Sequence, residues 1–182
     1  LKNADDIEQA LAANQGVADT IKAQITDYKT LQETAAGIST LVPVNDSTSV
    51  KVREQYETFP YPRWKSFSVA AIRRDWKASK KYEEIEKRLR GKKTKILIAG
   101  CGTGREALSY AAVFPEADIL AVDLSRTSLA YAINKAKELG ITNVTFKQAD
   151  ILKLSALNEQ FDCITSTGVL HHMKDPVQGW TV

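Results

Sequence analysis

The strongest constraint in the sequence is a glycine-rich turn between an apolar segment and a helical segment. Residues 95–99 read KILIA, and the turn GCGTG follows at residues 100–104. A second apolar segment ends in Asp123, 19 residues beyond Gly104. A glycine turn that joins a strand to a helix, followed by an acid at the end of the next strand, is typical of sites that bind a nucleoside. The sequence therefore predicts a nucleotide-like cofactor.

The spacing of the glycines narrows the kind of cofactor. They stand at positions 100, 102 and 104, whereas the dinucleotide fingerprint needs glycine at position 105, where this chain has Arg105. The tighter spacing lets an uncharged or zwitterionic ligand lie across the turn, while the dinucleotide spacing brings a helix N-terminus close to a pyrophosphate. A purely structural strand-to-helix turn is the alternative explanation of these glycines.

Apolar and helical segments alternate along the second half of the chain. We expect strands at about 95–100, 118–123, 144–148 and 161–167, with helices at about 104–113 and 126–139. Strands that alternate with helices indicate parallel pairing through right-handed crossovers. The predicted fold class is therefore α/β, with a doubly wound parallel sheet.

The first half of the chain reads as a helical appendage. Residues from about Asn3 to Ala36 have the spacing of two amphipathic helices, broken near residues 14–16, and residues 41–48 read as a linker. A short helix at about 50–57 precedes the Tyr-Pro-Arg-Trp segment at 61–64, and helical spacing resumes over 69–89. We divide the chain into an appendage with its linker (1–48), a helical connector or lid (49–92) and a partial α/β domain (93–182).

Two acids follow predicted strands at the edge where open α/β sheets bind ligands. The Asp123 carboxylate can accept hydrogen bonds from both hydroxyls of a ribose. The alternative is an N-cap for the next helix, which Ser125 can also provide. Asp150 can accept from the exocyclic amine of a base, with Ile151 against the ring, and the alternative is an ordinary turn aspartate.

The remaining reactive residues point to no metal centre. The only histidines, His171 and His172, are adjacent, and no cluster of cysteines or acids completes a metal site around them. Cys101 and Cys163 match neither a zinc framework nor a secreted disulfide scaffold, so we expect reduced thiols. No apolar run approaches the roughly 18 residues of a membrane span, so we expect no membrane partner and a cytoplasmic location.

Four segments in order carry a resemblance to a known family. They are ILIAGCGTG at 96–104, AVDLS at 121–125, QADI at 148–151 and FDCITSTGVLHH at 161–172. Together they resemble the class I S-adenosylmethionine-dependent methyltransferases, and Tyr56 to Trp64 resembles the Tyr-Pro-Arg-Trp element that precedes this domain in some bacterial proteins. The resemblance implies a Rossmann-like sheet whose first four strands have the order 3-2-1-4, S-adenosylmethionine as cofactor, and transfer of its methyl group to an unidentified acceptor.

The resemblance also implies roles for individual residues. It places the methionine part of the cofactor on the turn, the ribose on Asp123 and the adenine amine on Asp150. One departure is Ile98, because many members have an acid at this position, and its loss removes one polar anchor. No catalytic residue is assigned, but Tyr56, Tyr61, Arg63 and His171 are candidates to shape or polarise an acceptor, or to pack as a lid. The predicted cofactor-binding set is Gly100, Cys101, Gly102, Thr103, Gly104, Asp123, Leu124, Ser125, Asp150, Ile151, Thr167, Gly168 and Val169.

The family's sheet has seven strands, and this sequence stops after the fourth. We therefore expect an exposed fourth strand, covered by another copy of the chain, by the N-terminal helices, or by both, and hence a homo-oligomer. Cofactor binding is expected to persist in the partial domain while acceptor binding is lost. Residues 50–95 hold 15 basic and 6 acidic side chains, which slightly favours an acidic acceptor such as nucleic acid, although solvated helix faces explain this charge more simply.

Two other functions stay open at this point. The first is another nucleotide-dependent enzyme, a dehydrogenase of the NAD type, which Arg105 disfavours. The second is a non-catalytic interaction module, in which the appendage and the basic segment bind a partner. Replacing Asp123 with alanine separates the enzyme from the module, because only the enzyme needs the cofactor.

Overall fold

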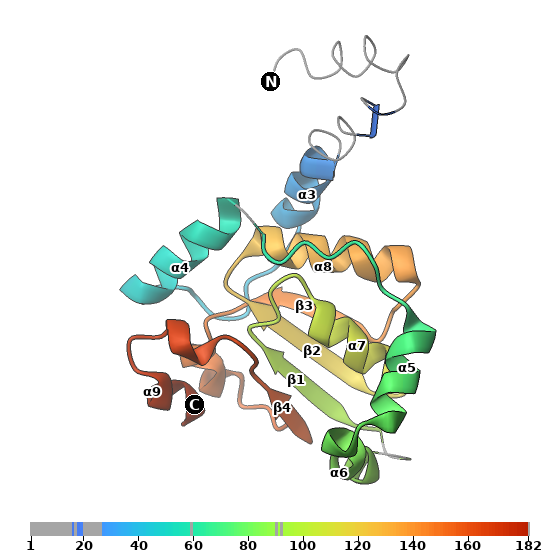
Figure 1. The fold of residues 1–182 in the computed structure, drawn as a ribbon. Helices are drawn as coiled ribbons and strands as arrows, with labels where there is room; N and C mark the ends of the chain where they lie inside the picture. The colour runs from blue at the N-terminus through green and yellow to red at the C-terminus, as the bar shows by residue number, and fades with distance from the viewer. Residues whose placement is uncertain are drawn as a thin grey trace.

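The core of the fold is a parallel sheet of four strands (Figure 1). A computed structural model describes residues 16, 18–19, 27–58, 60–89, 91 and 93–181. The sheet order is β3-β2-β1-β4, which confirms the predicted fold class and strand order. The strands are β1 (Lys95–Ala99), β2 (Asp118–Asp123), β3 (Val144–Gln148) and β4 (Cys163–Thr165).

Successive side chains of each strand point to opposite faces of the sheet, and both faces are buried. Ile96 and Ile98 pack in one apolar cluster with residues of α7 (Arg105–Val113) and α8 (Arg126–Leu139). Leu97 and Val122 pack in a second cluster with residues of the 3-10 helix η2 (Ile151–Leu157). Burial on both faces explains why the central strands β1 and β2 are mostly apolar, whereas the edge strand β3 (VTFKQ) contains polar residues.

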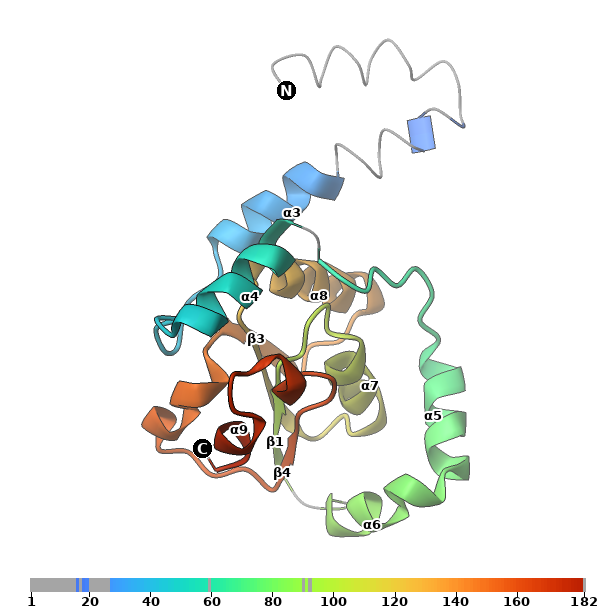
Figure 2. The same ribbon diagram turned by 60° about the vertical axis from the view of Figure 1, so that its left-hand side comes forward.

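The predicted helix over 69–89 is two helices. They are α5 (Val69–Ala78) and α6 (Lys80–Leu89), and Ser79 between them is extended, with φ −94° and ψ 113°. Trp76 near the end of α5 is buried and contacts the rings of Tyr110 and Phe114, on and just after α7. The break lets this tryptophan pack beside α7 while Leu89, at the end of α6, is also buried in the core. Figure 2 shows α5 beside α7, with α6 continuing from the lower end of α5.

The fourth strand is shorter than the predicted 161–167. It pairs with β1 only from Cys163 to Thr165, opposite Ile96 to Ile98. Gly168, with φ +70°, lies just beyond it, and the chain then enters η3 (Leu170–His172) and α9 (Pro176–Trp180). Ile164 at the outer edge is 61% exposed.

The described N-terminal helices pack on α8. They are α3 (Asp27–Ala36) and α4 (Ser47–Thr58), which begins three residues before the predicted 50–57 and within the predicted linker. Between them, Leu41 N–H donates to Gln148 C=O, and Gln148 N–H donates to Ser39 C=O, so this segment lies along β3. Helix α3, which belongs to the predicted N-terminal helices, packs on α8, and the cover of the fourth strand by these helices or by another copy stays a prediction. The first predicted helix, before the break near residues 14–16, lies outside the described residues.

Candidate cofactor site of the α/β domain

The glycine turn folds back over the end of β2. The N–H groups of Gly100 and Cys101 donate to Val122 C=O, at 2.8 and 2.9 Å. The N–H of Gly104 donates to Cys101 C=O at 2.9 Å and closes the turn. Because α7 begins at Arg105, the turn lies at the carboxyl edge of the sheet, where open α/β sheets bind ligands.

The Asp123 carboxylate, at the end of β2, holds the turn in place. Its Oδ2 accepts from Gly102 N–H at 2.7 Å, and its Oδ1 accepts from Ser125 N–H at 2.9 Å. An ionised carboxylate can accept about four hydrogen bonds, so about two acceptor positions remain for the hydroxyls of a ligand. Burial raises the pKa of Asp123, although the hydrogen bonds from Ser125 and Gly102 oppose this shift.

The N-terminus of α8 is capped by other residues. The buried Ser125 Oγ accepts from Ser128 N–H at 3.0 Å. The Glu57 carboxylate, from the end of α4, accepts from the N–H groups of Arg126 and Thr127, both at 2.9 Å. An anion is favourable at this position because the first turn of a helix carries unpaired N–H donors. Asp123 is therefore not needed as the cap, which was the alternative reading of this acid.

Asp150 has one carboxylate oxygen without a partner. Its Oδ1 accepts from Leu152 N–H at 3.0 Å and starts η2, so the turn role expected as the alternative is real. Its Oδ2 is buried and has no hydrogen-bond partner, and the whole residue is only 1% exposed. A buried polar atom without a partner destabilises the fold by about 1–3 kcal/mol, so its presence beside a cavity points to a ligand donor.

The segment after β4 approaches the first turn of α7. Thr167 Oγ1 donates to Glu106 Oε1 at 3.1 Å. Sequence reasoning missed Glu106, although its position two residues after the glycine turn, in the first turn of a helix, already placed it near the site. Its negative charge contributes to raising the pKa of the Cys101 thiol, after burial and the charge of Asp123.

These groups surround one cavity of about 1490 Å³. Gly104 and Ser125 lie outside its lining and face the protein interior. An added Cβ at Gly104 would lie 2.4 Å from Cβ of Ala132 on α8, so this glycine allows close packing of the turn against α8. The members of the predicted set that line the cavity are Gly100, Cys101, Gly102, Thr103, Asp123, Leu124, Asp150, Ile151, Thr167, Gly168 and Val169.

Comparison with known families decides the nature of this site. Residues 90–179 match the family model of a methyltransferase domain. This segment belongs to the methyltransferase domain family. The match starts five residues before β1 and ends within α9, so this domain contains all four strands and the glycine turn.

The matches between the methyltransferase domain and individual relatives cover only part of each relative. A release factor glutamine methyltransferase of Flavobacterium psychrophilum is 40% identical over 75 residues, 41% of this chain and 26% of the relative. An uncharacterised Synechococcus protein is 38% identical over 86 residues, 47% of this chain and 21% of the relative. The chain thus spans about a quarter of the length of these two curated relatives.

A solved structure supports the same fold for the methyltransferase domain. It concerns the conversion of a disulfide bond into a thioacetal group during echinomycin biosynthesis. The protein in that structure is 26% identical to this chain, with a TM-score of 0.50. The match covers 72% of this chain and 53% of the other protein's chain.

The residues of the methyltransferase domain fit S-adenosylmethionine, the cofactor of this family. The spare acceptor positions of Asp123 match the two ribose hydroxyls, and the unpartnered Oδ2 of Asp150 matches an adenine amine. Ile98 is fully buried in β1, so the polar anchor that many members have at this position is absent. Glu106, in the first turn of α7, is another acid that lines the cavity.

The four candidates to shape or polarise an acceptor divide into two groups. Tyr56 and Tyr61 line the cavity of the methyltransferase domain, whereas Arg63 and His171 do not. His172, and not His171, lines the cavity. It contacts the Tyr56 ring edge-on, with 6.2 Å between the ring centroids.

The described residues contain no group of three or more histidines, cysteines or acids that could hold a metal ion. Cys101 and Cys163 are both free cysteines. In the part of the chain that the structure describes, no helix is long and apolar enough to cross a membrane.

Proposed function

We propose that the whole protein transfers the methyl group of S-adenosylmethionine to an acceptor. The observation that carries the proposal is the pair of carboxylates that follow neighbouring strands. Asp123 pairs with Gln148 in the sheet, and Asp150 lies two residues beyond Gln148, so both acids line the cavity from adjacent strand ends. A nucleoside presents its ribose hydroxyls and its exocyclic amine as donors, and this pair of acceptors suits them.

Methyl transfer requires the protein mainly to position the cofactor and the acceptor. S-adenosylmethionine supplies a sulfonium methyl that is already activated for transfer. The residues of this chain then hold the cofactor and bring an acceptor in line with that methyl, which accounts for much of the acceleration. Asp123 and Asp150 orient the nucleoside, and Glu106, hydrogen-bonded to Thr167, places a negative charge on the side of the turn where the methionine part is expected.

The cavity has room for more than the cofactor. Its volume of about 1490 Å³ exceeds the roughly 300–1000 Å³ of most single-ligand sites, so an acceptor fits beside the cofactor. None of the described basic residues between 50 and 95 lines this cavity. The charge of that segment therefore gives no support to an acidic acceptor in the cavity, and the class of acceptor is left open.

Calorimetry with S-adenosylhomocysteine tests the cofactor part of this proposal. We expect the wild-type protein to bind, and Asp123→Ala to lose most of its affinity. Asp118→Ala is the matched control, because Asp118 is an exposed acid at the other end of the same strand. Binding of NAD in place of S-adenosylhomocysteine would support the dehydrogenase, and binding of neither would support a non-catalytic module.

Transfer itself is tested with S-adenosylmethionine labelled on its methyl group. The protein and Asp123→Ala are incubated with protein, RNA and small-molecule fractions of a cell extract. Label that appears in one fraction with the wild-type protein alone identifies the class of acceptor. Binding of the cofactor without label in any fraction would contradict turnover by this chain.

Two further features are part of the proposal. The unpaired cysteines favour a cytoplasmic location, since reduced thiols are usual in that compartment. The exposed Ile164 at the outer edge of β4 favours self-association. Light scattering that shows a monomer at high concentration would refute the homo-oligomer.

A further inference from the structure

The segment from Pro60 to Ser68, here called the strap, joins α4 to α5. It precedes the segment 90–179 that matches the methyltransferase domain. In Figure 1 it runs as an irregular connection across α8 before it reaches α5. The strap therefore lies outside the matched domain in sequence but against it in space.

The strap is bonded to the glycine turn at a single residue, Thr103. The Thr103 hydroxyl donates to Pro62 C=O at 2.6 Å, and Trp64 Nε1–H donates to Thr103 C=O at 3.1 Å. Thr103 is only 2% exposed and Trp64 is 8% exposed, so water cannot easily replace these bonds. The strap thus bonds both the hydroxyl and the C=O of Thr103.

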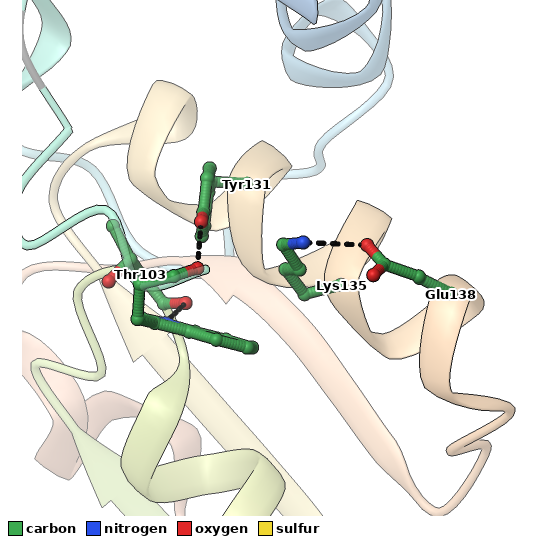
Figure 3. Close-up of polar contacts among 5 residues, drawn as sticks. Thr103, Tyr131, Lys135 and Glu138 are labelled. Atoms are coloured by element: carbon green, nitrogen blue, oxygen red, sulfur yellow. Dashed lines mark hydrogen bonds and ion pairs between the residues drawn. The ribbon is translucent and has the colours of Figure 1, made fainter. Parts of the chain in front are cut away.

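Helices α7 and α8 hold the strap at the same place. The Tyr131 hydroxyl of α8 donates to Trp64 C=O, and Figure 3 shows Tyr131 directed toward this group beside Thr103. The Arg105 guanidinium donates to Ser66 C=O at 3.1 Å and lies 5.9 Å from the centre of the Trp64 ring. Lys135, paired with Glu138 in Figure 3, lies 5.7 Å from the same ring. Arg105, which departs from the dinucleotide fingerprint, therefore anchors the strap.

The strap also forms part of the cavity wall. Tyr61 and Pro62 line the cavity, together with Gly102 and Thr103 of the turn. The Tyr61 C=O lies 3.9 Å from the position of an added Cβ at Gly102, so the backbones of strap and turn are close at this point. Tyr61 is 72% exposed, so its ring is accessible to a ligand in the cavity.

We infer that the strap is a functional part of the cofactor site. Trp64 is a positioning residue, because it fixes the Thr103 C=O and with it the turn that receives the methionine part. Tyr61 is a contact residue, whose exposed ring covers the cofactor where it crosses Gly102. This inference rests on the proposed function, since it concerns the same cofactor.

Trp64→Phe tests the positioning role. It keeps an aromatic ring but removes the Nε1–H, and one lost hydrogen bond corresponds to about 2- to 10-fold weaker binding of S-adenosylhomocysteine. Ile119→Val is the control for general loss of stability, because Ile119 is buried in β2 and does not line the cavity. We expect both variants to melt at a lower temperature and only Trp64→Phe to bind more weakly. Equal affinity of Trp64→Phe and wild type would overturn the positioning role.

Tyr61→Ala tests the contact role without a stability penalty. Because the side chain is exposed, we expect an unchanged melting temperature, together with about 2- to 10-fold weaker binding from the lost ring contact. Tyr28→Ala is the matched control, since Tyr28 is an exposed tyrosine on α3 that does not line the cavity. Unchanged affinity of Tyr61→Ala would overturn the contact role. Failure of the wild-type protein to bind would instead refute the proposed function, so the two failures are distinguishable.

Discussion

The two glycines at positions 102 and 104 should respond very differently to the same substitution. Both have positive φ angles, +51° at Gly102 and +81° at Gly104. A Cβ at Gly104 would lie 2.4 Å from Cβ and 3.2 Å from Cα of Ala132, which is fully buried on α8. A Cβ at Gly102 has its nearest neighbour at 3.9 Å, the Tyr61 C=O. Gly104→Ala therefore disturbs packing, whereas Gly102→Ala enters the cavity.

The magnitudes follow from these contacts. A left-handed conformation at a residue with a Cβ costs about 1–2 kcal/mol, and both variants share this term. Carbon atoms in contact normally lie about 3.5–4.0 Å apart, so α8 must move by roughly 1 Å to accept a methyl group on Gly104, and overpacking of this kind costs about 1–3 kcal/mol. We expect Gly104→Ala to lose about 2–5 kcal/mol of unfolding free energy, and Gly102→Ala about 1–2 kcal/mol.

Two measurements on the same samples check this prediction. In a protein of this size 1 kcal/mol shifts the melting temperature by about 2–4 °C, so Gly104→Ala should melt about 2–12 °C below Gly102→Ala. Calorimetry below both transitions should show the reverse order, with weaker binding of S-adenosylhomocysteine by Gly102→Ala. Equal melting temperatures, or a folded Gly104→Ala that fails to bind, would refute the assignment of Gly104 to packing.

Three further predictions concern the acids and the thiols. Asp150→Asn should weaken binding of S-adenosylhomocysteine about 5- to 150-fold in calorimetry, because an amide either opposes the adenine amine or gives up the bond from Leu152 N–H, and unchanged affinity would count against the adenine role. Because burial raises the pKa of Asp123 above its ordinary 3.8, the folded state binds this proton more tightly, and the resulting stability is lost as the pH rises from 3.8 through the raised pKa. Urea unfolding across this range should show wild type losing stability relative to Asp123→Asn, and a gain would contradict the shift. Burial raises the pKa of Cys101 well above 9.0, so mass spectrometry after iodoacetamide treatment at about pH 8 should find the less buried Cys163 modified first, and the opposite order would contradict this assignment.

The sheet was predictable because its signals are local. β1 and β2 are continuous apolar segments that end at a glycine turn and at an acid, and strong segments of this kind need little tertiary information. The break at Ser79 was not predictable, because neither glycine nor proline marks it. It depends on where Trp76 meets Tyr110 and Phe114, a contact made across about 35 residues of sequence.

The candidate site was predictable only where parallel strands determine position. The carboxyl ends of such strands meet at one edge, so Asp123 and Asp150 could be placed together from sequence. The roles of Gly104 and Ser125 depend on which way a short turn faces, and both face the interior. Glu57 reaches the start of α8 from 69 residues upstream of Arg126, a separation that no local pattern reveals.

The contact between Glu57 and α8 limits which segment of this chain can be joined to another protein without loss of stability. A recombination that joined residues 90–179 to another protein would carry the whole glycine turn. It would leave behind the carboxylate that pairs with Arg126 and Thr127, and the indole that pairs with Thr103. Each lost hydrogen bond costs about 0.5–1.5 kcal/mol, against a typical total stability of about 5–15 kcal/mol. The segment that supports the glycine turn and the start of α8 therefore begins no later than α4, well before residue 90, where the family match starts.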